Sequence, residues 1–294
     1  MTSHEKHVET FVELVRRAST QLPDDVVAAL RSGHGREAEG SLASRALETI
    51  LQNVELADSA SAPICQDTGT PVVWIHHPRG ESTRELAAAF EEAVREATRK
   101  AYLRPNAVDT LSGKNTGSGT GRGIPSLHFE EWDEDRIEVL MVLKGGGSEN
   151  VGAQYRLPDS RLKAGRDVDG VRRVVLDAVV QAQGKGCAPG ILGVCIGGDR
   201  GSAFAESKRQ LLRPLGDTNP DSELAALEKR ILEEGNLLGV GPMGFGGQTT
   251  LLGVKIGVLD RLPASYFVTI SYMCWADRRA AVSIDRGGQV TWLS

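Results

Sequence analysis

The order of helix and strand patterns along the chain is the feature that most narrows its fold. The first sixty of the 294 residues are predicted to be helical, because apolar residues such as Leu47, Ile50 and Val54 recur at helical spacing after a candidate cap, Ser41. Beyond them, helix and strand patterns mix without the steady alternation of a doubly wound sheet. We therefore expect an α+β (mixed α/β) fold over a single domain, residues 1–294, with a helical N-terminal part and helices packed on a mixed sheet.

The clearest single helix is predicted over residues 82–102, where Ser82 and Glu85 form a capping-box pattern. A polar, glycine-rich loop follows from Leu103 to about Ser126, and such loops inside compact domains are usually functional or disordered. The remaining expected strands and helices are strands at 72–75, 126–129 and 136–144, a helix at 167–184, a strand at 191–198, helices at 198–212 and 221–238, and strands at 249–260 and 265–274.

The composition is that of an ordinary soluble globular protein, with 40% apolar residues, 25% charged residues and a net charge of −5. An acidic balance does not favour nucleic acid or an anionic membrane surface as a partner. The charged N-terminus lacks the apolar core of a signal peptide, and no stretch approaches the length of a membrane span. We expect a cytoplasmic protein with no nucleic-acid or membrane partner.

The four cysteines are too few for a disulfide framework, and a reducing compartment keeps them as thiols. Cys195 lies in the apolar run ILGVCIGG and is interpreted as a small buried hydrophobe. Cys65 and Cys187 lie among Gly and Pro in loops, and Cys274 ends an apolar strand. The three are 122 and 87 residues apart without a CxxC motif, which excludes a zinc knuckle or a ferredoxin-type run. Spacing alone leaves a three-cysteine cluster as the minority hypothesis beside core packing.

Six local sequences, taken together and in this order, resemble the class I fumarase family. They are PICQDTG around Cys65, NTGSG at 115–119, GGGSEN at 145–150, GCAPGILGVCIGG at 186–198, LGVGPMGFGG at 238–247 and CWADRRA at 274–280. The resemblance runs from about residue 20 to about residue 290. LPDDVVAAL, LRPNAV and LLRPLG are most similar to the α subunit of L-tartrate dehydratases, whereas GGGSEN is more similar to the fumarases.

The resemblance implies a 4Fe-4S cluster held at loop ends by Cys65, Cys187 and Cys274, with one iron left open and Cys195 outside the ligand set. An open iron acts as a Lewis acid that can bind a hydroxyl and a carboxylate of the substrate. The implied substrate is a small dicarboxylate or hydroxy acid.

Further site residues follow from the same resemblance. It implies catalytic roles for Gln66 and Asp67, substrate binding by Arg104, and backbone N–H groups supplied by Gly146 or Gly147. A guanidinium offers a planar fork that suits a carboxylate. The residues alone leave plainer alternatives open, because Asp67 also suits a turn and Arg104 also suits the end of a helix.

The glycine-rich run GKNTGSGTGRG fits neither a phosphate-binding P-loop nor a dinucleotide fingerprint. A surface loop is the plain interpretation. Alternatively, Thr116 and Ser118 could surround a substrate carboxylate with hydroxyl and N–H groups, and we take Thr116 as a candidate substrate-binding residue.

The chain departs from the family pattern at two positions. Leu262, twelve residues before Cys274, stands where the family carries a histidine thought to act in proton transfer, and leucine can neither donate nor accept a proton. Gln248 replaces a lysine of the family's glycine turn. His76 and His77 are interpreted as the end of a surface strand, with metal binding by the pair as the alternative. Either of them, or His128, is a candidate replacement if the fold brings it near the site. Three basic residues near the motifs are interpreted as solvated or charge-paired, with a secondary option of holding the cluster's negative charge: Lys144, Arg278 and Arg279.

The leading hypothesis is the α subunit of a hydro-lyase that hydrates or dehydrates a small hydroxy dicarboxylic acid of the fumarate/malate type. The alternatives are an L-tartrate dehydratase α subunit and a diverged hydro-lyase with Leu262 as a pocket wall. The family active site is completed by a β-type domain, so we expect a separate β subunit, together with homodimerisation through the α-type chain. A non-enzymatic, cluster-binding regulatory subunit is the competing class; Leu262 favours it, and the retained Asp67 and Arg104 oppose it.

Overall fold

The computed structural model describes residues 2–293, which form two compact units. Unit 1 contains residues up to 23, residues 53–145 and residues from 278 onward, and unit 2 contains residues 24–52 and 146–277. The mixed α+β class is confirmed, and the assignment of the whole chain to one domain stays a prediction.

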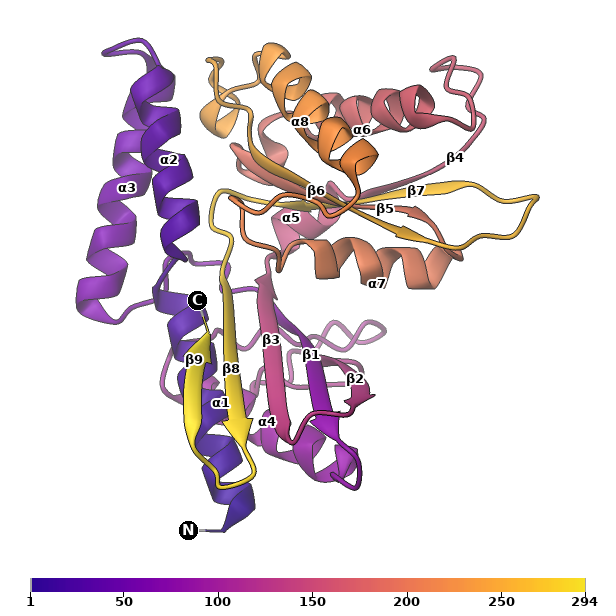
Figure 1. The fold of residues 1–294 in the computed structure, drawn as a ribbon. Helices are drawn as coiled ribbons and strands as arrows, with labels where there is room; N and C mark the ends of the chain where they lie inside the picture. Colours follow the sequence, from indigo (N-terminus) through magenta and orange to yellow (C-terminus); the bar gives the residue numbers. More distant parts are fainter. Residues whose placement is uncertain (1, 294) are drawn as a thin grey trace. The chain divides into compact units, whose positions relative to one another are not determined.

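Helices fill the first sixty residues, as predicted (Figure 1). They are α1 (Ser3–Thr20), α2 (Asp24–Arg36) and α3 (Leu42–Ala60). The backbone N–H of Ser44 donates to Ser41 Oγ at 3.1 Å, so Ser41 caps α3 as expected. The helical N-terminal part is nevertheless divided, because α1 belongs to unit 1 and α2 to unit 2.

Unit 1 is a five-stranded mixed sheet with helices on one face (Figure 1). The strands lie in the order β2 (Ser126–Trp132), β1 (Thr70–Pro78), β3 (Arg136–Lys144), β8 (Arg279–Asp285) and β9 (Val290–Leu293). Only the β1–β2 pair is parallel. Helices α1 and α4 (Thr83–Arg99) pack apolar side chains, including Phe11 and Phe90, against buried sheet residues such as Ile75 and Met141. This core supports the loops at the strand ends.

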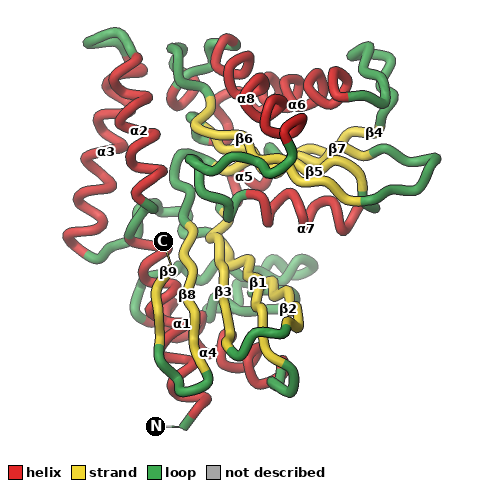
Figure 2. The backbone as a smooth tube through the Cα atoms, viewed as in Figure 1, coloured by secondary structure: helices red, strands yellow, loops and turns green. Residues whose placement is uncertain are grey.

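Unit 2 is a four-stranded sheet between two layers of helix (Figures 1 and 2). Its strands lie in the order β4 (Ala153–Arg156), β7 (Phe267–Met273), β5 (Gly190–Gly197) and β6 (Leu251–Leu259). Helices α6 (Val168–Ala182) and α8 (Ser222–Leu237) cover one face, and α7 (Arg200–Gln210) covers the other. The strand β5 is buried along nearly its whole length, which agrees with its apolar sequence.

Several elements differ from the sequence-based expectation. The GGGSEN run begins a short helix, α5 (Gly146–Asn150), and the helix predicted over 167–184 ends in a 3-10 turn, η1 (Gln183–Gly186). A second such turn, η2 (Pro242–Gly244), lies in the glycine-rich run before β6. The strands β4, β8 and β9 were not predicted, because each is short or carries charged residues among its apolar ones.

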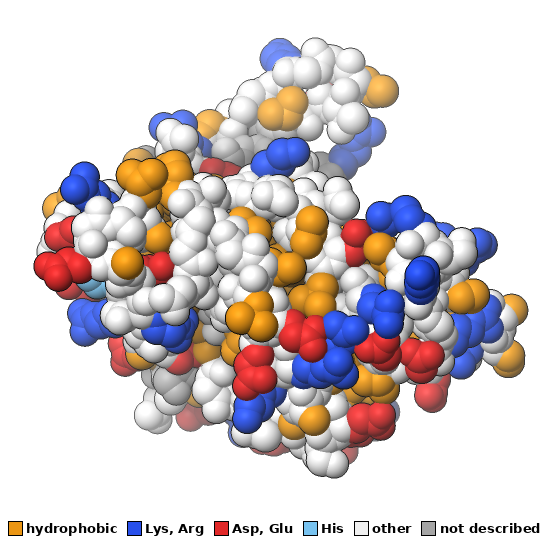
Figure 3. Space-filling view, turned by 90° about the horizontal axis from the view of Figure 1, so that it is seen from above, with side chains coloured by type: hydrophobic (Ala, Val, Ile, Leu, Met, Phe, Trp, Pro, Cys, Tyr) orange, Lys and Arg blue, Asp and Glu red, His pale blue; other side chains and the backbone are white. Residues whose placement is uncertain are grey.

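Acidic and basic side chains lie next to one another on the face shown in Figure 3. Ion pairs on α6 and α8 include Arg173 with Asp169 at 2.7 Å and Arg230 with Glu234 at 2.8 Å. Exposed pairs of this kind contribute little to stability. Among the described residues, no helix has the length and apolar character needed to cross a bilayer.

Candidate functional site

The loop that carries Cys65 in unit 1 is fixed on the residue before the cysteine. Ile64 is buried, its N–H donates to the Ser19 carbonyl at 3.0 Å, and its carbonyl accepts from Asn53 Nδ2 at 2.8 Å. Helices α1 and α3 therefore hold both backbone groups of Ile64. Cys65 itself is half-buried, and the side chain of the neighbouring Gln66 is exposed.

Asp67 adopts the turn geometry that its position in QDTG suggested. Its Oδ1 accepts the N–H of Gly69 at 3.1 Å, which is a side-chain-capped turn. Its backbone carbonyl accepts from Arg278 Nη1 at 2.6 Å. Asp67 is thus held both within its own loop and from the start of β8, which is compatible with either the turn or the catalytic interpretation.

Arg104 lies beside this loop because Thr68 joins the two segments. Thr68 is 1% exposed, and its Oγ1 accepts the backbone N–H of Arg104 at 2.9 Å and Nδ2 of Asn106 at 3.2 Å. Asn106 also donates to the Gly69 carbonyl at 3.2 Å, and the Arg104 side chain is exposed. Sequence reasoning missed Thr68 and Asn106 as organising residues, although both lie inside the recognised QDTG and LRPN motifs.

The glycine-rich loop is folded back on the Arg104 segment. Thr116 N–H donates to the Ala107 carbonyl at 2.9 Å, and Asn115 Nδ2 donates to the Pro105 carbonyl at 2.6 Å. Ser118 Oγ lies 3.3 Å from Thr116 Oγ1. The loop is therefore internally hydrogen-bonded, and the exposed Thr116 is in the same part of unit 1 as Arg104.

Cys187 and Cys274 lie close to each other in unit 2. The N–H of Trp275, directly after Cys274, donates to the Cys187 carbonyl at 3.2 Å. Both thiols also interact electrostatically with Tyr272, whose pKa is raised first by burial and then by the negative charge that these thiols would carry. Two of the three predicted cluster ligands are thus neighbours, and both are half-buried.

The turn that presents Cys187 is an unusual backbone conformation held by close packing. Cys187 has φ 55° and ψ 63°, in the left-handed region that a non-glycine residue rarely adopts. On one side, a Cβ on Gly184 would lie 2.8 Å from the Met243 carbonyl oxygen, and Met243 N–H donates to the Ala188 carbonyl at 2.8 Å. Backbone strain of this kind persists only where the surroundings enforce it, and it gathers at functional sites.

The glycine-rich run that supports this turn is fixed at its base by Glu37 of the α2–α3 corner. The buried Glu37 carboxylate accepts from Gln248 N–H at 3.0 Å and from Thr249 N–H at 2.8 Å. Gln248 thus contributes its backbone here, and its own side chain is exposed. No sequence pattern indicated Glu37, because it lies outside every recognised motif.

The glycines of GGGSEN lie on both sides of the unit boundary. Gly145 ends the unit 1 segment after β3, and Gly146 and Gly147 open α5 in unit 2. A Cβ on Gly147 would lie 3.9 Å from the Lys185 carbonyl oxygen, in the η1 turn before Cys187. The predicted N–H donors of this run are therefore neighbours of the Cys187 turn within unit 2.

Cys195 differs from the other three cysteines. It is fully buried in β5, and burial, with a smaller contribution from the charge of Glu206, raises the pKa of its thiol to about 12. A metal ligand must be a thiolate, so this environment does not suit one. The half-buried, paired Cys187 and Cys274 do fit an iron–sulfur group. Within residues 2–293, however, the structure has no group of three or more His, Cys, Asp or Glu side chains at metal-binding distances.

Leu262, one of the two positions that depart from the family pattern, lies outside these clusters. Leu262 is 74% exposed in the loop between β6 and β7, whereas Cys274 follows the other end of β7. A seven-residue strand spans about 20 Å, so Leu262 does not line the Cys187–Cys274 pair.

The histidines proposed as replacements lie along β1 and β2 in unit 1. His76 Nε2 lies 3.0 Å from Glu130 and its ring stacks on Trp132, and His128 stacks on Trp74. His77 is buried, with Nδ1 3.1 Å from the Pro78 carbonyl. All three histidine side chains are therefore held by contacts to residues of β1 and β2.

The basic residues Lys144 and Arg278 are only 5% and 1% exposed, so neither is solvated, and the charge-paired interpretation of the same expectation stays a prediction. Each lies at a strand end next to a motif glycine or loop, where burial of a charge requires nearby acceptors. Arg279 is partly exposed at the start of β8.

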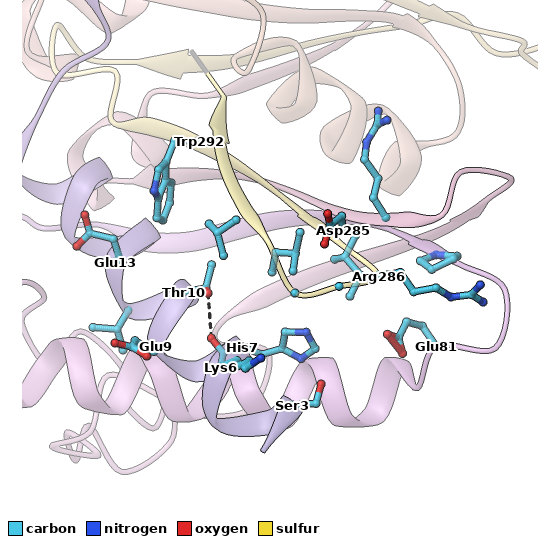
Figure 4. Close-up of a pocket in the computed structure, with 18 of the residues that line it drawn as sticks. Ser3, Lys6, His7, Glu9, Thr10, Glu13, Glu81, Asp285, Arg286 and Trp292 are labelled. Carbon is cyan, nitrogen blue, oxygen red and sulfur yellow. Dashed lines mark hydrogen bonds between the residues drawn. The ribbon is translucent and has the colours of Figure 1, made fainter. Parts of the chain in front are cut away.

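A cavity of about 960 Å³ lies elsewhere in unit 1, between α1, the turn at 78–81 and the β8–β9 hairpin (Figure 4). Its lining residues include none of the predicted site residues. Its charged side chains are partly paired, as in Arg286 with Asp135 at 3.2 Å, and burial lowers the pKa of His7. The cavity gives no support to the predicted chemistry.

The sequence profile of the family described as "Fumarate hydratase (Fumerase)" matches residues 8–283. The chain is 46% identical over 294 residues to "Putative fumarate hydratase class I" of Geobacillus stearothermophilus. That alignment covers 98% of this chain but 57% of the relative, so the chain spans little more than half of that protein.

Two further relatives are of similar length to this chain. It is 36% identical over 277 residues to "Putative L(+)-tartrate dehydratase subunit alpha" of Methanocaldococcus jannaschii, which covers 92% of this chain and 95% of the relative. It is 32% identical over 281 residues to "L(+)-tartrate dehydratase subunit alpha" of Escherichia coli (strain K12), which covers 95% and 91%.

Proposed function

Because the chain belongs to the fumarate hydratase (Fumerase) family, we propose that it is the α-type part of an iron–sulfur-dependent hydro-lyase. The class I family is iron–sulfur dependent. The reaction would be the reversible addition of water to a small unsaturated dicarboxylic acid. Fumarate/malate is the first substrate pair, because the relative with 46% identity carries a fumarate hydratase name.

The observation that carries the proposal within the molecule is the Cys187–Cys274 neighbourhood. The left-handed turn at Cys187, the hydrogen bond from Trp275 and the adjacent Gly147 bring two thiols and a run of backbone N–H groups together. Thiolates bind iron–sulfur clusters, and N–H groups directed at the sulfides stabilise them. Cys195 lacks such surroundings.

We propose that Cys65, Cys187 and Cys274 hold a 4Fe-4S cluster that keeps one iron without a protein ligand. When bound, such a cluster supplies a Lewis-acidic iron to the substrate hydroxyl and carboxylate. Three thiolate ligands from loop ends, two of them already adjacent, are the donor set that this arrangement requires.

Unit 1 would supply the groups that bind and orient the substrate. The exposed Arg104 guanidinium would pair with a carboxylate, and Thr116 would add a hydroxyl from the folded loop beside it. Asp67 would hold or move a proton, and the exposed Gln66 amide would orient the substrate or a water molecule. The N–H groups of Gly146 and Gly147 would receive a second carboxylate.

A separate β-type subunit would complete the enzyme. The relatives named as α subunits match this chain over 91–95% of their length, whereas the fumarate hydratase relative is much longer. We further propose homodimerisation through the α-type chain and a cytoplasmic location.

The test is fumarate hydration by the anaerobically reconstituted chain together with its β-type partner. Conversion of fumarate to malate, followed by the loss of the ultraviolet absorbance of the conjugated double bond, is the expected result. Absence of turnover on fumarate, malate and tartrate with a fully loaded cluster would refute the proposal and favour the regulatory alternative.

L-Tartrate dehydration is the second candidate, favoured by the matched length of the two tartrate dehydratase α relatives. It is decided in the same assay, because tartrate would then give oxaloacetate at a higher kcat/KM than fumarate gives malate.

A further inference from the structure

Arg278 is the largest of the fully buried side chains, with 1% of its surface exposed. A guanidinium keeps its charge in proteins, and transferring that charge out of water is very costly unless acceptors surround it. The group that accepts a hydrogen bond from Arg278 therefore indicates the role of this residue.

The acceptor that the structure shows belongs to the loop of Asp67. Arg278 Nη1 donates to the Asp67 carbonyl oxygen at 2.6 Å. A Cβ built on Gly145 would lie 3.3 Å from Arg278 Nη2 and 2.9 Å from Asp67 Oδ2, so both charged groups border the same α-carbon. The guanidinium thus faces the backbone and the carboxylate side of one residue.

Arg278 is itself fixed by the sheet of unit 1. Its carbonyl accepts the Leu143 N–H at 2.9 Å, which continues the pairing of β3 with β8. A Cβ on Gly69 would lie 2.9 Å from the Leu143 carbonyl carbon, so the end of the Asp67 loop rests directly on β3. The sheet therefore holds Arg278 in place, and Arg278 in turn holds the backbone of Asp67.

A purely structural role accounts poorly for this residue. Arg278 Nε has no hydrogen-bond partner among the described residues, and a buried donor without an acceptor costs stability. An apolar side chain of similar volume would fill the same space without that cost.

We propose that Arg278 is a positioning residue that fixes the carboxylate of Asp67. Position 145 would then be glycine because a side chain there would come too close to the Asp67 carboxylate and the Arg278 guanidinium. The inference depends on the proposed function, in which Asp67 moves a proton. The planar fork of arginine reaches the carbonyl and the carboxylate side at once, which a lysine ammonium cannot reproduce.

The test compares Arg278→Lys and Gly145→Ala in the reconstituted enzyme with its β-type partner. Gly145 does not occupy the left-handed region, so alanine adds only a methyl group between the two charges. We expect kcat to fall about 100-fold in Arg278→Lys and about 10-fold in Gly145→Ala, with KM changed by less than about threefold, because misplacing a reacting group lowers the rate of the chemical step.

Matched controls use the same substitutions at exposed positions. The first control is Arg286→Lys, at the other end of β8, where the arginine side chain is 82% exposed. The second is Gly216→Ala, because no atom lies within 4 Å of a Cβ added at Gly216. Both should keep the kcat of the parent enzyme. Iron content and the thermal midpoint of each variant separate positioning from folding, and Gly145→Ala keeps the test valid if Arg278→Lys does not fold.

A second readout needs no activity. In the apo chain, site-resolved alkylation of Cys65 should accelerate about fivefold in both variants, because a loosened loop opens more often. Unchanged kcat and unchanged Cys65 alkylation would overturn the inference, as would a loss of kcat fully explained by lost iron. If the parent enzyme turns over none of its three acids, the proposed function fails, while the alkylation rates still decide whether Arg278 fixes this loop.

Discussion

The two compact units hold their cysteines by different physical means. In unit 1 the Cys65 loop is fixed by directional hydrogen bonds, from Asn53 to Ile64 and from Arg278 to Asp67. In unit 2 the Cys187 turn is fixed mainly by glycines packed against Tyr272 and the η2 turn. Hydrogen bonds can be removed one at a time, whereas close packing of glycine tolerates almost no added atom. Unit 2 should therefore be the more sensitive to small changes in volume.

The largest expected effect is that of Gly190→Ala in unit 2. A methyl group at this position would overlap the ring of Tyr272, which is itself 2% exposed and cannot move aside. We expect the free energy of unfolding to fall by about 2–3 kcal/mol. Urea denaturation measures this value, and Gly216→Ala, where the methyl meets nothing, should stay within about 0.5 kcal/mol of the parent. A loss below about 1 kcal/mol for Gly190→Ala would mean that unit 2 repacks easily.

Glu37→Ala tests the hydrogen bonds by which the buried Glu37 carboxylate holds the glycine-rich run of unit 2. Removing a buried carboxylate leaves the N–H groups of Gln248 and Thr249 without their acceptor, so we expect a loss of about 2 kcal/mol in the free energy of unfolding. Glu39→Ala, two residues away and exposed, is the control and should change little. Equal effects of the two substitutions would show that the hydrogen bonds of Glu37 do not contribute to the stability of the fold.

Asn53→Ala removes one hydrogen bond from the Cys65 loop. We expect a loss of about 1 kcal/mol, because the Ile64 carbonyl is buried and loses its side-chain donor. Chemical denaturation measures the loss, and the neighbouring exposed Gln52→Ala serves as the reference. A loss larger than that of Gly190→Ala would reverse the proposed contrast between the units.

The smallest effect concerns the pH dependence contributed by Cys195. Its folded pKa of about 12 lies above the ordinary value of 9.0, so the folded state keeps a proton that the unfolded chain releases as the pH rises above about 9. Stability is therefore retained below pH 9 and lost above it, by roughly 0.8 kcal/mol between pH 8 and 9.5. Cys195→Ala should lack this component when urea midpoints are compared at the two pH values. An identical pH dependence in parent and variant would show that the thiol is not shielded from water.

Much of the fold follows from local sequence patterns. The boundaries of β3 agree with the apolar run at 136–144, and Ser82 and Ser41 cap the helices that they were expected to cap. Local rules suffice there because periodicity and capping involve residues within one element. The strand β8 was missed because its pairing with β3 joins segments more than a hundred residues apart, and β9, which pairs only with β8, was missed with it.

The site was predictable only where a recognised motif carried it. Arg104 and Asp67 were assigned from motifs, and their proximity depends on Thr68, whose bridging hydroxyl no pattern indicates. The burial of Arg278 was not predictable either, because an arginine after a strand is usually solvated. Such residues are defined by the neighbours that the fold brings to them, so only the structure identifies them.

Iron and sulfide content distinguishes three cysteines that hold a cluster, Cys65, Cys187 and Cys274, from a fourth that is a core residue, Cys195. Each cysteine is changed singly to serine, and the four variants are purified without oxygen beside the parent protein. We expect about four iron and four sulfide per parent chain, a brown colour that is lost in the variants at positions 65, 187 and 274, and full content in Cys195→Ser. Loss of iron in Cys195→Ser alone, or a parent chain that binds no iron with its β-type partner present, would contradict it.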